Sequence, residues 1–255
     1  MRIENLRTEA KGDKRKIAAT VVWEDSNRPT QELYFETTAE FAGGLSPDPQ
    51  AFVVAAIVPA LWHGERRLLV EREICPELRV GLTTVMGLFK HWYRLDPDLV
   101  RIETSATSGT EMSPIPERAG FFFTGGIDSL ATLCANRLTF PLQHPGSLKD
   151  GIIVYGLEVD KPEAFDYVLS SLTSIAQKTG ISLIPVFTNI RYLNDDWTFW
   201  YDAYMGAALC AVAHALRRRL TVVSIASDYD IPHLAPHGTH PLIEPNFGKI
   251  GRAHV

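Results

Sequence analysis

Six consecutive residues suited to binding phosphate, Thr-Gly-Gly-Ile-Asp-Ser at positions 124–129, follow a run of three phenylalanines. The two glycines have no Cβ, so the backbone can curl until successive amide N–H groups converge on an anion. The hydroxyls of Thr124 and Ser129 add donors, and the dipole of a helix beginning near Asp128 favours negative charge at the same place. This combination predicts a cradle for pyrophosphate.

Two common phosphate-binding loops do not fit this spacing, because no lysine follows the glycines and the pattern G-x-G-x-x-G is not formed. The segment instead resembles SGGxDS, the PP-loop of the N-type ATP pyrophosphatase (adenine nucleotide alpha hydrolase-like) superfamily, which includes asparagine synthetase and 7-cyano-7-deazaguanine synthase. Thr124 replaces the first serine and keeps its hydroxyl. The stretches FFFTGGIDSL, TNIR and GTHPLIEP are similar to a branch with an extra N-terminal region. The resemblance covers residues 119–248.

The resemblance implies an ATP-dependent, AMP-forming ligase. In this superfamily a substrate oxygen attacks the α-phosphorus of ATP, pyrophosphate leaves, and an amine, ammonia or sulfur nucleophile then displaces AMP. Asp128 and Ser129 would be catalytic, with Asp128 also binding Mg²⁺. The ATP site implied by the resemblance comprises Phe123, Thr124, Gly125, Gly126, Ile127, Asp128, Ser129, Leu157 and Asp160.

Polar residues after the later strands are candidates for substrate contact. Asn189 and Arg191 follow the third strand of this half, where Arg191 is either a clamp for phosphate or carboxylate or an exposed loop arginine. Gly238, Thr239 and His240 follow the fourth strand and repeat the pattern of a glycine before donors. Asp160 either meets the ribose or substrate, or caps the next helix.

Three side-chain groups have simpler interpretations. His233, His237 and His240 are interrupted by prolines and lack a cysteine partner, which disfavours zinc. The stripe Trp197, Trp200, Tyr201 and Tyr204 is more typical of core than of a substrate platform. Cys134 and Cys210 lie in apolar helical patterns and are expected in the core, which weighs against sulfur transfer as the second step.

The elements expected after residue 119 alternate between strand and helix. Short runs rich in β-branched residues, such as GIIVYGLEV and ISLIPVFT, separate helical segments, including one long helix from Trp197 to the arginines at 217–219. This rhythm predicts an α/β fold with a doubly wound parallel sheet. The superfamily resemblance implies a HUP-like strand order of 3-2-1-4-5, with the fifth strand beyond Lys249.

The first half has a different pattern. Residues 16–24 and 32–37 predict two strands, residues 46–64 a helix, RRLLVE a strand, and residues 76–95 an amphipathic helix. We therefore expect an N-terminal α+β domain at 1–103, a linker at 104–118 and the PP-loop domain at 119–249. Residues 250–255, IGRAHV, match the translation of a sequencing adapter, so we expect an artefact on a truncated chain.

The net charge of the chain limits the classes of binding partner that we expect. The 255 residues carry a net charge of −5, which gives no general attraction to nucleic acid. We expect a cytoplasmic protein with no membrane partner, a small-molecule substrate and amide or amidine formation as the second step. Modification of a tRNA base, a non-catalytic ATP- or AMP-binding module and a homodimer remain open.

Overall fold

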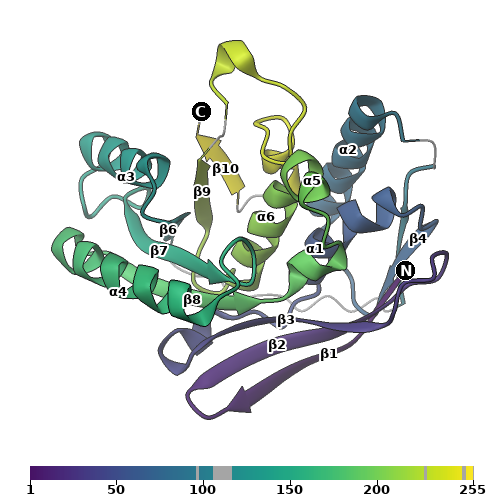
Figure 1. Cartoon of the computed structure of the whole chain (residues 1–255), viewed down its shortest axis with the longest axis horizontal. Coiled ribbons are helices and arrows are strands. Elements are labelled where there is room, and N and C mark those ends of the chain that lie inside the picture. Colours follow the sequence, from purple (N-terminus) through teal and green to yellow (C-terminus); the bar gives the residue numbers. More distant parts are fainter. Residues whose placement is uncertain (96–97, 106–116, 227–228, 249–250, 255) are drawn as a thin grey trace.

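The computed structural model describes residues 1–95, 98–105, 117–226, 229–248 and 251–254, the last four as backbone only. Figure 1 shows strands curving through the molecule with helices on both sides. The strands are β1 (Arg2–Lys11), β2 (Lys14–Val22), β3 (Gln31–Thr38), β4 (Arg67–Val70), β5 (Arg101–Thr104), β6 (Ala119–Phe122), β7 (Leu148–Tyr155), β8 (Ser182–Thr188), β9 (Val222–Ala226) and β10 (Gly251–His254). The helices are α1 (Gln50–Trp62), α2 (Pro76–Tyr93), α3 (Ile127–Thr139), α4 (Pro162–Thr179), α5 (Trp197–Phe199) and α6 (Met205–Ala215).

The described strands form one mostly parallel sheet in the order β10-β9-β6-β7-β8-β3-β2-β1-β4-β5. The expected α/β class is therefore confirmed. Within the second half the order β8-β7-β6-β9-β10 is 3-2-1-4-5, and every pairing among these strands is parallel. The fifth place is taken by the backbone of Gly251–His254; the suggested adapter origin of residues 250–255 stays a prediction.

The two halves of the chain meet at the antiparallel pair β3–β8. Phe35 lies opposite Thr188 and Thr37 lies opposite Val186 in this pair. The Thr37 hydroxyl also donates to the Pro185 carbonyl at 2.7 Å. The expected boundary at 104–118 lies mostly outside the described residues, which resume at 117.

A separate hydrophobic core packs against each face of the sheet. In β7, Ile152 belongs to the larger cluster, which includes α1 and α6, whereas its neighbour Ile153 belongs to a smaller cluster with residues of α3 and α4. Alternation along a strand sends neighbouring side chains to opposite faces, so α1 and α6 cover one face and α3 and α4 the other. Helix α1 is apolar on all sides and almost wholly buried, as a helix inside the larger core must be.

Sequence patterns located most of these elements. Helix α4 begins with Pro162 in its first turn and ends at Gly180, whose φ of +69° forms the left-handed cap that glycine favours. Strands β1 and β5 were not expected. In β1 the pairing register shifts between Glu4 and Arg7, around Asn5 with φ +58°, and this bulge breaks the alternation by which a strand is recognised.

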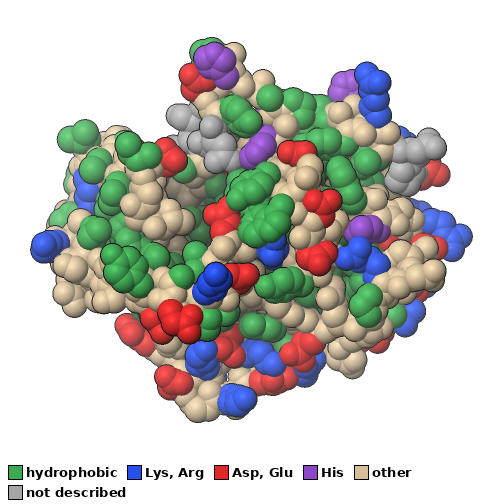
Figure 2. All heavy atoms as spheres, viewed as in Figure 1, with side chains coloured by type: hydrophobic (Ala, Val, Ile, Leu, Met, Phe, Trp, Pro, Cys, Tyr) green, Lys and Arg blue, Asp and Glu red, His purple; other side chains and the backbone are tan. Residues whose placement is uncertain are grey.

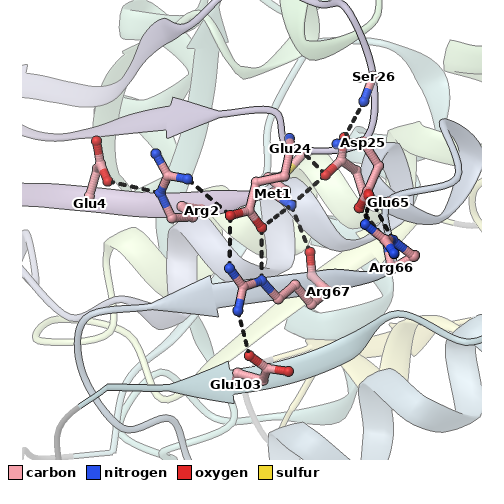
Figure 3. A network of polar contacts seen from close by, with 10 residues as sticks. All are labelled: Met1, Arg2, Glu4, Glu24, Asp25, Ser26, Glu65, Arg66, Arg67 and Glu103. Atoms are coloured by element: carbon pink, nitrogen blue, oxygen red, sulfur yellow. Dashed lines mark hydrogen bonds and ion pairs between the residues drawn. The ribbon is translucent and has the colours of Figure 1, made fainter.

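A polar network fixes the start of the chain (Figure 3). The buried Glu65 carboxylate accepts backbone N–H groups from Glu24 at 3.0 Å and from Asp25 and Ser26 at 3.1 Å, and it pairs with the Met1 α-ammonium group. Arg67 joins β4 to this network through Glu24, with both nitrogen–oxygen distances at 2.9 Å. Because of these contacts, the pKa of Glu24 lies far below its usual range.

The expected long helix from Trp197 is interrupted. One turn of α5 leads into a π-helical turn, Trp200–Tyr204, before α6 continues to Ala215. Turns of this type widen the backbone and recur at functional sites. Among the described residues no helix combines the length and apolar character needed to cross a membrane.

Candidate functional site

A cavity of about 510 Å³ lies at the carboxyl ends of β6, β7 and β9. Its volume is within the range of about 300–1,000 Å³ that is typical of small-molecule sites. Apolar side chains from both sides of the sheet form much of its wall, among them Ile152, Val154, Leu157, Phe165, Met205 and Ile225. In a doubly wound sheet this is the edge at which ligands bind.

The glycine-rich turn lies at the cavity. Thr124, Asp128 and Ser129 all line it. Gly125 has φ +79°, and a Cβ there would lie 2.9 Å from Leu172 Cδ2, so both conformation and space select glycine. The turn is held by short contacts: Gly125 N–H donates to Ser129 Oγ at 3.1 Å, and Ser129 Oγ donates to the Gly126 carbonyl at 2.9 Å.

Helix α3 begins at this turn with its N-terminal N–H groups open. Gly126 is the N-cap and provides no side-chain hydrogen bond, so the first-turn N–H groups after it have no intrahelical acceptor. Asp128 is exposed in that first turn, and Ile127 is 81% exposed. The turn therefore presents the first N–H groups of α3 beside one carboxylate.

Phe122, rather than Phe123, reaches the cavity. Phe123 is fully buried in the opposite core, where its ring lies 5.0 Å from that of Phe121. The expected placement of Phe123 around the base is therefore not what the structure gives. Three phenylalanines in a row contain no alternation, so the sequence could not decide which of them faces the cavity.

The end of β7 contributes Leu157 and Glu158. Gly156 has φ +94°, and a Cβ there would lie 1.8 Å from the Thr188 carbonyl oxygen, so only glycine fits this reversal. Glu158 then lines the cavity and accepts a hydrogen bond from Trp200 Nε1 at 3.4 Å. Asp160 is exposed and does not line the cavity, and α4 is capped at Lys161 without any side-chain hydrogen bond.

The two candidates after β8 have different environments. Asn189 accepts the Tyr34 N–H at 3.1 Å and donates to the Glu32 carbonyl at 2.7 Å, so it fastens β8 to β3. Arg191 is only 4% exposed, which excludes the exposed loop arginine considered from sequence. Neither residue lines the cavity.

The loop after β9 docks on the π-helical turn. The Gly206 N–H donates to the Gly238 carbonyl at 3.0 Å, and the Gly238 N–H donates to the Tyr201 carbonyl at 3.1 Å. This docking brings Thr239 and His237 to the cavity. Gly238 is buried and serves the docking itself, as a Cβ on it would lie 2.8 Å from the Tyr201 carbonyl oxygen.

The three histidines of this loop do not converge. His233 is exposed beside Asp230, whereas His240 is buried against Trp92 with ring centroids 4.8 Å apart. Burial, and to a smaller extent the neighbouring His237, lowers the pKa of His240. Over the described part of the chain there is no cluster of three or more side chains suited to hold a metal ion.

The aromatic stripe divides between core and surface. Trp200 and Tyr204 are buried, whereas Trp197 and Tyr201 are 47% and 45% exposed and stack with centroids 5.8 Å apart. Trp200 and Tyr201 line the cavity, a role that a helical stripe alone does not indicate. Of the cysteines expected in the core, Cys210 is buried but Cys134 is exposed, because α3 buries only Ser129 and Leu133.

The surface is mixed in charge. Figure 2 shows Lys or Arg and Asp or Glu side chains interspersed at the bottom of the view, where β1–β3 lie in Figure 1. The ion pairs of this region include Lys16 with Glu9 and with Glu32, each at 2.9 Å. Comparisons of the chain with protein-family models, with curated proteins and with solved structures found no match.

Proposed function

We propose that the chain is an ATP-dependent adenylating enzyme of the PP-loop type, which cleaves ATP to AMP and pyrophosphate. The observation that carries the proposal is the position of the Thr124–Ser129 turn at a largely apolar cavity of about 510 Å³. A nucleotide has the matching form, because an apolar base is joined to a polyphosphate. The strand order 3-2-1-4-5 supports a HUP-like fold.

The residues present fit a bound triphosphate. Gly125 gives the turn its left-handed conformation, and the open N–H groups at the start of α3 are donors for phosphate oxygens. The Thr124 hydroxyl is exposed at the same turn. Ser129 is already engaged with Gly125 and Gly126, so its first task in this proposal is to hold the turn in shape.

Asp128 is the residue that would hold Mg²⁺. Magnesium sites in ATP-using enzymes commonly combine one or two carboxylates with phosphate oxygens and water, so a single carboxylate fits. When bound there, Mg²⁺ would supply positive charge to offset the charge of a pyrophosphate leaving group. Leu157, Val154 and Ile225 give the cavity an apolar wall, against which the base is expected to pack.

In the proposed reaction, a substrate oxygen attacks the α-phosphorus and an amine or ammonia then displaces AMP, giving an amide or amidine. Glu158, Tyr201, His237 and Thr239 line the cavity from elements other than the phosphate turn, so they are the side chains available to the acceptor. The interspersed charges on β1–β3 favour a small acceptor over tRNA.

The test is product analysis. The protein is incubated with ATP, Mg²⁺ and a metabolite extract, and AMP with pyrophosphate is measured separately from ADP with orthophosphate. We expect AMP and pyrophosphate in equal amounts, and a loss of at least 100-fold in Asp128→Asn. Asp166→Asn is the matched control, because Asp166 is an exposed carboxylate of α4 outside the cavity.

The competing outcome is a module that binds ATP or AMP without turnover. It would give a rise in melting temperature with ATP but no pyrophosphate in any extract. In that case Asp128→Asn would weaken nucleotide binding without any activity to lose. ADP and orthophosphate as the only products would refute the adenylation chemistry.

A further inference from the structure

Arg191 is a buried cation for which the described residues provide no acceptor. It lies in the short turn Ile190–Leu193 that follows β8, and it is 4% exposed. Its Nε is buried and has no hydrogen-bond partner. Among the described residues its guanidinium group forms no hydrogen bond and no ion pair.

This isolation is costly for arginine in particular. The guanidinium group stays charged and presents five N–H donors, and burying a charge without a partner carries a large desolvation penalty. The Trp197 ring offsets part of it, because the guanidinium carbon lies 3.6 Å from the ring centroid. An aromatic face attracts the charge but accepts no conventional hydrogen bond, so the donors at the edge of the guanidinium group remain available.

Three other partly buried arginines in this half of the chain are paired. Arg118 and Arg219 both donate to the buried Asp150, and Arg217 donates to Asp48 at 2.8 Å. Arg191 is the one arginine among the buried polar residues of the described chain. Its missing acceptor is therefore a local feature and not the general state of arginines in this protein.

Arg191 is connected to the cavity through stacked rings. Trp197 contacts the guanidinium group and also stacks on Tyr201, and Tyr201 lines the cavity. Both rings are nearly half exposed, so a ligand can reach them. Strand β8, which ends just before Arg191, pairs in parallel with β7, whose end contributes Leu157 and Glu158 to the cavity.

We propose that Arg191 binds an oxyanion, a carboxylate or phosphate group, of a small-molecule substrate that extends from the cavity past Tyr201 and Trp197. Two oxygens of a carboxylate or of a phosphate group match the arginine fork and can accept two hydrogen bonds from it. The exposed Asp195 and Asp196 in the next turn favour a single small anion over a polyanion, because their charges repel additional phosphates. The assignment of this oxyanion to the acceptor substrate or to the nucleotide rests on the proposed function.

The test is calorimetric titration of the whole chain with sodium benzoate, inorganic phosphate and MgATP as separate probes. We expect saturable binding of benzoate or phosphate to the wild type and at least tenfold weaker binding to Arg191→Met. Arg28→Met is the matched control, because Arg28 also lies over a tryptophan, 5.3 Å from the Trp23 ring centroid, but that tryptophan does not stack on a residue that lines the cavity. A tenfold loss for MgATP would identify the nucleotide as the source of the oxyanion; a loss for benzoate alone would identify a carboxylate acceptor.

Equal binding by the wild type and Arg191→Met, or no saturable binding of any probe to the wild type, would overturn the proposal. Arg191→Lys keeps the charge but loses the planar fork of donors. We expect this variant to bind the probes at least fivefold more weakly than the wild type. It therefore provides a second test if Arg191→Met does not fold. Without ligand, Arg191→Met should melt at the same temperature or higher, since it removes an uncompensated charge. The benzoate and phosphate titrations contain no nucleotide, so they can succeed even if no AMP is ever formed.

Discussion

The Gly206 N–H donates to the Gly238 carbonyl oxygen at 3.0 Å, and a Cβ on Gly206 would lie 2.2 Å from that oxygen. Two backbones thus approach as closely as two glycines allow, at the point where the loop after β9 meets the π-helical turn. This contact places His237 and Thr239 on the cavity wall.

Gly206→Ala is expected to separate the loop from the helix. The added methyl group cannot fit beside a backbone oxygen, so we expect a loss of about 1–3 kcal/mol in the free energy of unfolding. Urea denaturation measures this loss, and proteolysis of the folded protein should show faster cleavage near His237. Gly87→Ala is the control: Gly87 is exposed in α2 with open space around it, so alanine should leave stability unchanged or raise it by up to about 1 kcal/mol. Unchanged stability in Gly206→Ala would contradict the docking.

Gly125→Ala is expected to damage nucleotide binding beyond its effect on stability. Alanine at φ +79° costs about 1–2 kcal/mol, and its Cβ would press on Leu172. Gly180→Ala is matched in conformation, with φ +69° at the end of α4 and open space around it. Both variants should lose stability from the left-handed backbone, Gly125→Ala somewhat more because of Leu172, but only Gly125→Ala should lose the melting-temperature shift given by MgATP. Equal shifts in the two variants would argue against the phosphate turn.

Stability should fall below neutral pH because of His214. Its Nε2 donates to the Phe247 carbonyl at 2.6 Å, while its Nδ1 is buried without a partner, and burial lowers its pKa from 6.5 to about 4. The unfolded chain therefore binds this proton at a higher pH than the folded chain does. The contribution is fully present above about pH 6.5 and is lost as the pH falls towards 4, by up to about 3 kcal/mol.

The measurement for His214 is the free energy of unfolding in urea at pH 7.5, 6 and 5. His91→Gln, at an exposed position of α2, should keep the slope of the wild type. His214→Gln should flatten it, because it removes the group that titrates. An unchanged slope in His214→Gln would assign the acid sensitivity to other groups.

Glu65→Gln is expected to destabilise the start of the sheet. The carboxylate is 1% exposed and accepts three backbone N–H groups besides its pairing with Met1, so an amide loses charge and one acceptor oxygen at once. We expect a loss of about 3 kcal/mol in the free energy of unfolding. Glu4→Gln, which removes a partly exposed ion pair with Arg2, should cost less than about 1 kcal/mol. Similar costs for both variants would contradict a special role of Glu65.

Sequence reasoning succeeded where local pattern decides structure. Pro162 and Gly180 delimit α4, and the apolar runs of β7 and β8 predict buried parallel strands. It failed where a conformation depends on partners distant in sequence. The sequence predicts Asp160 as the acid that follows the second strand of this half, but the chain reverses at Gly156 and Glu158 lines the cavity instead. The burial of Arg191 likewise depends on Trp197 folding over it, which no spacing in TNIR reveals.

The β3–β8 pair joins the two halves of the chain into one sheet. Its three residue pairs, together with the bonds of Asn189 to Tyr34 and Glu32, form the seam of the sheet. The larger core runs beneath that seam, with Phe35 from one side and Val186 from the other. Parting the halves would uncover two unpaired strand edges and the apolar surface beneath them, so either half alone would be a template for aggregation.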